Sequence, residues 1–209
     1  MAKLESTFKN MVLVLSSITL VAALALGSVY NLTKEPIEAS KIAKQQNAIM
    51  EVLPPDVSIK ETDTVLVDGM QDPLYVYKAY KDDEFIGAAV QTYSKNGFSG
   101  EIKIMVGFDK NGNIINYSVL EQKETPGLGT KMVDWFKTNK GKQNICGLNA
   151  KTNNLKVTKD GGEIDAITAA TISSNAFLES VRIAYSAYSS NFDGLSGATE
   201  TNNELSQTN

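Results

Sequence analysis

Hydroxyl side chains gather where a polar stretch of the chain gives way to a predicted amphipathic helix. Thr168, Thr171, Ser173 and Ser174 all fall in this short segment. The first turn of a helix carries unpaired backbone N–H groups and the positive end of the helix dipole, so it binds phosphate readily. One capping hydroxyl is enough for an ordinary helix start. The segment therefore has two interpretations, a capped helix or a phosphate site.

A second segment, Glu124–Lys131, has an unusual composition for a turn between a strand and a helix. It combines Pro126, which fixes the backbone angle φ, with Gly127 and Gly129, which permit backbone conformations closed to other residues. Two compact loops that each lead into a helix suit a flat cofactor with a phosphate tail. Backbone N–H groups of the loops can bind the polar edge of the ring, while the tail meets the helix.

The composition narrows the chemistry that these loops could support. The 209 residues include no histidine and one cysteine, Cys146, and the formal net charge is −4. The lack of histidine excludes histidine acid–base catalysis and most catalytic zinc sites. One cysteine can form neither an internal disulfide nor, alone, an iron–sulfur cluster. The negative charge argues against a nucleic-acid partner. Redox chemistry would therefore need an organic cofactor or carboxylates.

A mixed fold is predicted to position the loops. Short runs rich in β-branched and aromatic residues predict an antiparallel meander of about five strands: Thr64–Val67, Tyr75–Tyr80, Phe85–Tyr93, Glu101–Phe108 and Ile114–Leu120. The remaining predicted elements are a helix over Lys131–Lys137, a short strand over Leu155–Thr158 and a final helix from about Thr171. Consecutive strands with helices set apart from them indicate an α+β class, with a mainly antiparallel sheet and flanking helices.

Two sets of apolar residues are predicted to form part of the core. In the final helix a stripe with helical spacing is expected to be buried: Ile172, Ala176, Phe177, Ser180, Val181, Ala184, Ala187 and Tyr188. In the preceding helix Met132, Trp135 and Phe136 are expected to face inward, since large apolar side chains of an amphipathic helix usually do so. These three residues are therefore assigned to the core and not to a cofactor.

The N-terminal region predicts a membrane anchor. Residues 11–32 contain no charged side chain, and at about 1.5 Å per residue such a helix reaches roughly 33 Å, enough to cross the ~30 Å hydrocarbon core. A cleaved signal peptide is the alternative, but the apolar stretch is longer than the usual signal core of about 7–15 residues. Lysines flank the span on both sides, so the charge bias does not decide its orientation. The expected organisation is a head at 1–10, a transmembrane helix at 11–32, a helical stalk at 33–55 that Pro36 can open, one domain at 56–190 and a disordered tail at 191–209.

Four segments together carry a resemblance to a known family. They are Gly97–Ile102 (GFSGEI), Met105–Asp109 (MVGFD), Glu124–Gly129 (ETPGLG) and Asp165–Ser173 (DAITAATIS). In this order they resemble the FMN-binding domain of the G subunit of the Rnf ion-translocating electron transport complex. The C subunit of the sodium-pumping NADH:quinone reductase shares these motifs. The resemblance covers essentially the whole chain, from the apolar N-terminal span to the final helix.

The resemblance implies that FMN is bound covalently, with its phosphate esterified to the last threonine of a Ser/Thr-Gly-Ala-Thr motif. That threonine corresponds to Thr171, and a flavin transferase outside the cytoplasm would attach the FMN from FAD. No metal site and no catalytic residue is implied. The other cofactor-binding residues that the matched motifs imply are Glu124, Thr125, Gly127, Leu128, Gly129, Lys131, Thr168, Ala169, Ala170 and Ser173.

The resemblance also implies a function in a membrane complex. The protein would be an electron-carrying subunit, without independent catalytic activity, of an Rnf complex that couples electron transfer between ferredoxin and NAD⁺ to Na⁺ or H⁺ movement. Its partners would be the membrane subunits and the iron–sulfur and flavin subunits. It would cross the bacterial inner membrane once, with a cytoplasmic head and a periplasmic domain. Two alternatives stay open: the C subunit of a quinone reductase, and an anchored extracytoplasmic domain that binds a ligand without redox chemistry.

Three features depart from the family pattern or compete with it. Ala169 stands where the family motif has glycine, so backbone strain is expected there if that glycine needs a positive φ. Gln122 stands near the position where the family often has histidine. The segment Ser196–Thr199 (SGAT) matches the modification motif more literally than the helix start does. We nevertheless expect Thr171 to carry the flavin, because no predicted helix or apolar surface follows the C-terminal segment to hold the ring.

Overall fold

The computed structural model describes residues 7–196, and its internal contacts divide the chain into two units with the boundary between Lys44 and Gln45. The first unit consists of most of helix α1 (Phe8–Val52), which is long and apolar enough to cross a membrane. Pro36 lies inside this helix and does not begin a new one. A proline removes one backbone hydrogen bond, and here the helix continues through it. The predicted span and stalk are therefore one continuous helix.

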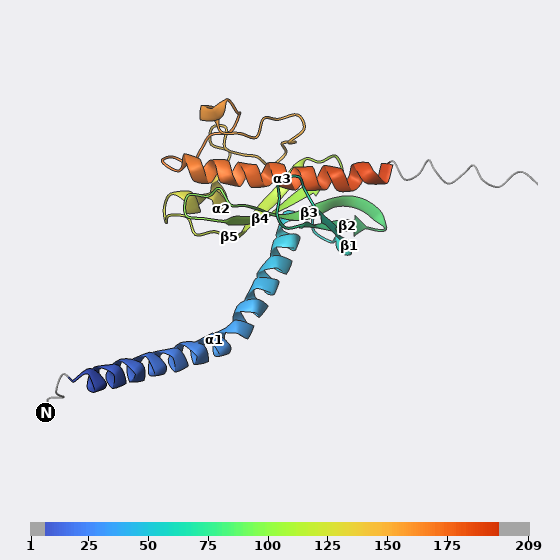
Figure 1. The fold of residues 1–209 in the computed structure, drawn as a ribbon. Coiled ribbons are helices and arrows are strands. Elements are labelled where there is room, and N and C mark those ends of the chain that lie inside the picture. Colours follow the sequence, from blue (N-terminus) through green and yellow to red (C-terminus); the bar gives the residue numbers. More distant parts are fainter. Residues whose placement is uncertain (1–6, 197–209) are drawn as a thin grey trace, which may run out of the picture. The chain divides into compact units, whose positions relative to one another are not determined.

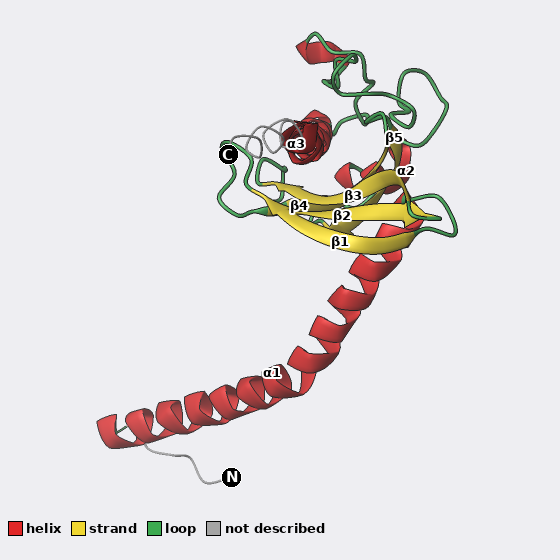
Figure 2. Ribbon diagram, turned by 90° about the vertical axis from the view of Figure 1, so that its right-hand side faces the viewer, coloured by secondary structure: helices red, strands yellow, loops and turns green. Residues whose placement is uncertain are grey.

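The second unit contains a five-stranded antiparallel sheet whose strands follow one another in chain order, as Figure 2 shows in yellow. This confirms the predicted α+β class and the meander. The first strand begins earlier than predicted, because it is an edge strand paired with one neighbour and its exposed residues are mostly polar. Such a strand lacks the alternation that marks a half-buried one. The five strands are β1 (Ser58–Val65), β2 (Leu74–Lys81), β3 (Glu84–Ser94), β4 (Ile102–Asp109) and β5 (Ile114–Glu121).

Helices cover both faces of the sheet. The long helix α3 (Thr171–Ser196) lies along one face, and the main core is packed between them (Figures 1 and 2). On the opposite face the end of α1 packs Ala48 and Val52 against a smaller cluster that includes Met105. Gly107 of β4 makes this approach possible, since a Cβ atom there would lie 1.9 Å from the carbonyl oxygen of Val52.

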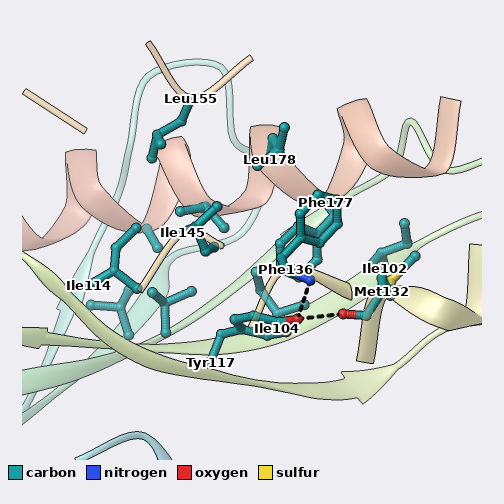
Figure 3. Packing of buried hydrophobic residues seen from close by; sticks show 14 of the residues in the cluster. Ile102, Ile104, Ile114, Tyr117, Met132, Phe136, Ile145, Leu155, Phe177 and Leu178 are labelled. Carbon is teal, nitrogen blue, oxygen red and sulfur yellow. Dashed lines mark hydrogen bonds between the residues drawn. The ribbon is translucent and has the colours of Figure 1, made fainter. Parts of the chain in front are cut away.

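Buried aromatic side chains join the sheet to the helices around the short helix α2 (Met132–Trp135). The ring of Phe136 stacks on that of Phe177 with centroids 4.5 Å apart, and Tyr117 meets Phe177 edge to face (Figure 3). The Tyr117 hydroxyl donates to the carbonyl oxygen of Met132 at 2.7 Å and accepts from the N–H of Phe136 at 3.2 Å. Burial raises the pKa of this hydroxyl, so it stays protonated and able to donate. Met132 and Phe136 are thus core residues, as predicted; Trp135 is half-buried and its ring N–H donates to the carbonyl oxygen of Asp165.

The segment between α2 and α3 is less regular than predicted. The expected helix over Lys131–Lys137 is a 3₁₀ turn, η1 (Gly129–Lys131), followed by the single turn of α2. In place of the strand expected at Leu155–Thr158, the structure has one isolated bridge from Val157 to Ile164 and the 3₁₀ turn η2 (Thr158–Asp160). Leu155 and Val157 are buried, so their apolar side chains fill the core without forming a ladder.

The final helix extends further than predicted. A disordered tail was expected from residue 191, yet α3 continues to Ser196. Phe192 explains the extra turn, because its ring packs 4.6 Å from that of Phe85 and 4.7 Å from that of Tyr188, one turn earlier. The amide of Asn191 also donates to Asp63 of β1 at 2.9 Å. Thr199, the competing modification site, lies outside the described residues.

Candidate functional site

Three segments that are distant in the chain enclose a pocket at the start of α3. They are the turn between β3 and β4, the loop between β5 and η1, and the turn that leads into α3. The pocket has a volume of about 350 Å³, within the range of small-molecule sites. Its lining residues are Phe98, Thr125, Leu128, Gly129, Ala169, Ala170, Thr171, Ile172 and Ser173.

The loop between β5 and η1 is held in a compact turn by its own backbone. The N–H groups of Leu128 and Thr130 both donate to the carbonyl oxygen of Thr125. The N–H of Gly127 donates to the Thr130 hydroxyl at 3.0 Å, and Gly127 has a φ of +76°. The glycine therefore serves a left-handed backbone that other residues adopt with difficulty. As a result Leu128 is brought to the pocket wall.

Ser174 ties the start of α3 to the turn that precedes it. The Ser174 hydroxyl accepts a hydrogen bond from the N–H of Ile167 at 2.9 Å and donates one to the carbonyl oxygen of Ala170, also at 2.9 Å. Its N–H makes the first helical hydrogen bond to the same carbonyl. Ser174 therefore joins the preceding turn to the helix, and its hydroxyl caps none of the N–H groups of the first turn. Among the described residues the Thr171 hydroxyl has no hydrogen-bond partner, and Thr171 lines the pocket.

The backbone turn before α3 is strained at the position where strain was expected. Ala169 has a φ of +60°, in the left-handed region. An L-residue in that region meets a clash between its Cβ atom and the backbone, and glycine does not. The family's glycine at this position is thus explained by the backbone conformation, which the alanine here adopts as well.

The start of α3 is also suited to an anion. The N–H groups of Thr171, Ile172 and Ser173 precede the first residue whose N–H bonds back along the helix, and no acidic residue lies in the first turn. The helix itself therefore places no acidic side chain at the positive end of its dipole, and the one carboxylate bonded to that turn is Glu124, through the hydroxyl of Ser173, among the described residues. A phosphate group there would gain charge-assisted hydrogen bonds.

Apolar side chains stand exposed around the same pocket. Phe98 is 66% exposed, Ile172 54% and Leu128 38%. Ile172 was predicted to belong to the buried stripe of the final helix, and this prediction is wrong. The buried apolar residues of this helix begin at Ala176, and Ile172 lines the pocket instead of joining the core. Three large apolar groups beside an anion-binding helix start are a fitting surface for a flat aromatic ring with a phosphate arm.

The expected site residues divide into two groups. Thr125, Leu128, Gly129, Ala169, Ala170, Thr171 and Ser173 line the pocket. Gly127, Lys131 and Thr168 are exposed and do not line it, and Glu124 is buried behind it. Phe98 and Ile172 line the pocket and were not expected to. Phe98 could have been found from the sequence, because it is an aromatic residue between Gly97 and Ser99 in one of the motif segments.

Metal and thiol chemistry find no support around this pocket. No cluster of metal-ligating side chains occurs among residues 7–196. Cys146 is half-buried away from the pocket lining, and burial raises the pKa of its thiol, which disfavours the reactive thiolate.

Comparison with known proteins gives one consistent family. The sequence model of the FMN-binding domain matches residues 97–186. Over 161 residues the chain is 33% identical to the G subunit of the ion-translocating oxidoreductase complex of Vibrio vulnificus (strain YJ016), a match that covers 72% of this chain and 75% of that protein. Identity to the protein of the same name from Yersinia pestis is 34% over 171 residues, or 77% and 80% of the two chains. Its counterpart from Aliivibrio fischeri (strain ATCC 700601 / ES114) is 30% identical over 204 residues, or 91% and 94%.

Proposed function

This chain belongs to the family of G subunits of the ion-translocating oxidoreductase complex, and from that membership we propose that it is a membrane-anchored electron carrier with FMN attached covalently to Thr171. The family supports a redox role as one subunit among several. The observation that carries the proposal is Thr171, which lines the pocket in the first turn of α3 and whose hydroxyl has no hydrogen-bond partner among the described residues.

The residues of the pocket fit FMN in both of its parts. The N–H groups of the first turn of α3 would bind the phosphate, and the ester to Thr171 keeps the remaining phosphate charge beside them. Phe98, Leu128 and Ile172 would contact the ring and shield it from water. When bound, the FMN supplies one- and two-electron chemistry, and the protein supplies its position.

Attachment of the FMN needs a donor and an enzyme. In the proposed reaction the Thr171 oxygen attacks the phosphorus of the FMN half of FAD, the pyrophosphate bond breaks, and AMP leaves. The proton of the hydroxyl passes to a base of the flavin transferase or to water. The exposed turn at Thr168 and Ala169 leaves the hydroxyl open to such an enzyme. The transferase, the periplasmic side of the domain and a bacterial inner-membrane location belong to this proposal.

The wider role follows from the family. As a subunit of an Rnf-type complex, the protein would relay electrons between neighbouring membrane, iron–sulfur and flavin subunits, while the complex couples ferredoxin:NAD⁺ electron transfer to Na⁺ or H⁺ movement. Residues 11–32 contain no Asp, Glu, Lys, Arg or His, the side chains that mark ion pathways inside membranes. The ion path would therefore lie in other subunits, and this chain would have no catalytic activity of its own.

The proposal is tested by the fate of the flavin after denaturation. Full-length protein from its native host is denatured and separated on a gel, and flavin fluorescence is measured before the labelled peptide is identified by mass. We expect fluorescent bands for the wild type, Thr171→Ser and Thr199→Ala, and none for Thr171→Ala. Fluorescence that is lost from the wild type on denaturation would show reversible binding and contradict the ester. Co-purifying subunits would separate an Rnf complex from a quinone reductase.

A further inference from the structure

Glu124 lies behind the wall of the pocket and touches each of the segments that form it. Its side chain is 4% exposed and does not line the pocket. One carboxylate oxygen, Oε1, accepts the backbone N–H of Ser99 at 3.0 Å. The other, Oε2, accepts the hydroxyl of Ser173 at 2.6 Å. Glu124 itself begins the loop that carries Thr125 and Leu128, so one side chain joins three walls.

Two glycines give this carboxylate the space that it occupies. A Cβ atom at Gly97 would lie 2.2 Å from the carbonyl oxygen of Gly100 and 2.7 Å from Oε1 of Glu124, and one at Gly129 would lie 2.6 Å from the hydroxyl oxygen of Ser173 and 2.8 Å from Oε2 of Glu124. Neither glycine has a positive φ, so their backbones do not require glycine. Gly100 and Gly127 are the opposite case, with φ of +125° and +76° and no atom within 4 Å of an added Cβ. Gly100 and Gly127 thus serve the backbone conformation, whereas Gly97 and Gly129 leave room for Glu124 together with the turn and the serine that it binds.

The geometry points to Glu124 as a positioning residue that organises the flavin pocket without touching the flavin. It fixes the turn that carries Phe98 through Ser99, and it fixes the first turn of α3 through Ser173. The identity of the ligand in this inference rests on the proposed function. The clamp, meaning the link that Glu124 makes between the Ser99 turn and Ser173, rests on its two hydrogen bonds. The sequence motifs imply that this glutamate binds the cofactor. In the structure its side chain does not line the pocket, so we assign it to holding the pocket walls in place and not to contacting the flavin.

The two donors explain which substitutions preserve the clamp. The Ser99 N–H can only donate, whereas the Ser173 hydroxyl can donate or accept. Glutamine can therefore accept from Ser99 through its carbonyl oxygen and donate to Ser173 through its amide. Alanine removes both bonds and leaves the Ser99 N–H and the buried Ser173 hydroxyl without this partner. Aspartate keeps the charge but is one methylene too short to reach both walls.

The first measurement is amide hydrogen exchange on full-length flavin-free protein, in the Thr171→Ala background with the absence of flavin checked by absorption. In Glu124→Ala the Ser99 amide should exchange about tenfold faster or more, because its hydrogen bond to the Glu124 carboxylate is lost. Glu124→Gln should restore protection to within about threefold of the background. Glu121→Gln, an exposed carboxylate at the end of β5, is the control and should change nothing. Core amides of β4 report whether each variant is folded.

The second measurement is the covalent flavin content of the same Glu124 and Glu121 variants with Thr171 intact. Flavin per protein should fall severalfold in Glu124→Ala and Glu124→Asp and recover in Glu124→Gln. Equal Ser99 protection in Glu124→Ala and the background would overturn the clamp. A Glu124→Gln protein with full protection but without flavin would show that the charge acts on the cofactor directly, which also overturns it. Failure of the proposed function would give a different result. The wild type would lack covalent flavin, while the Ser99 amide would still exchange faster in Glu124→Ala than in the background.

Discussion

Replacing Ala169 by glycine should stabilise the protein, because the alanine adopts a backbone conformation that favours glycine. Its φ of +60° lies in the left-handed region, which costs an L-residue about 1–2 kcal/mol. Glycine avoids this cost but gives the unfolded chain more freedom, which offsets about 0.4–1 kcal/mol. The methyl group of Ala169 is exposed, so little packing is lost. We expect a net gain of about 1 kcal/mol in the free energy of unfolding.

The assay is urea and thermal unfolding of the full-length flavin-free protein, followed by the near-ultraviolet circular dichroism of its tyrosines and tryptophan. A gain of about 1 kcal/mol corresponds to a rise in Tm of about 2–4 °C for a domain of this size. Ala170→Gly is the matched control, since Ala170 is 8% exposed and lacks a positive φ, and it should lose about 1 kcal/mol. If both glycine variants were destabilised equally, the strain at Ala169 would be refuted.

Three further predictions concern the support of the domain. Gly107→Ala should destabilise by about 1–3 kcal/mol in urea unfolding, because the new methyl group would displace Val52 from the sheet; protease cleavage at the end of α1 should become faster. Tyr117→Phe should cost about 1–3 kcal/mol by the same assay, since it leaves a buried N–H and carbonyl unpaired. Hydrogen bonding to Lys78 lowers the pKa of Asp63, so the stability that this carboxylate adds is present above its unfolded pKa of about 3.9 and is lost as the pH falls through the lowered value. Asp63→Asn should be less stable than the wild type at pH 7, and unfolding curves at decreasing pH should converge; a constant gap would contradict the pairing.

Much of the sheet could be predicted from the sequence, because most of its strands bury apolar side chains. The strands from Leu74 to Glu121 carry that signal, including the edge strand β5, whereas the exposed edge strand β1 does not. The end of α1 was assigned to a stalk, since nothing local to Val52 says that Gly107, far along the chain, leaves room for it. Helical spacing likewise misplaced Ile172, because periodicity identifies a face of a helix but not which of its turns join the core.

The site was predictable in its segments and less so in its contacts. The two motif loops and the helix start meet as expected, and the strain at Ala169 follows from a local rule. The role of Glu124 depends on partners 25 and 49 residues away, which no local pattern reports. Phe98 is a similar case, since an exposed aromatic side chain on a turn has no periodicity and is meaningful only beside the walls that complete the pocket.

The spread of the pocket along the chain has a consequence for biosynthesis. Its first wall is translated at Phe98, its second at Thr125, and its third only at the start of α3, close to the end of the described chain. A nascent or prematurely terminated polypeptide that stops before Thr171 has neither the hydroxyl proposed to carry the flavin nor the serine that pairs with Glu124. The pocket can therefore form only after translation has passed the start of α3, and a copy truncated earlier would lack one of its three walls.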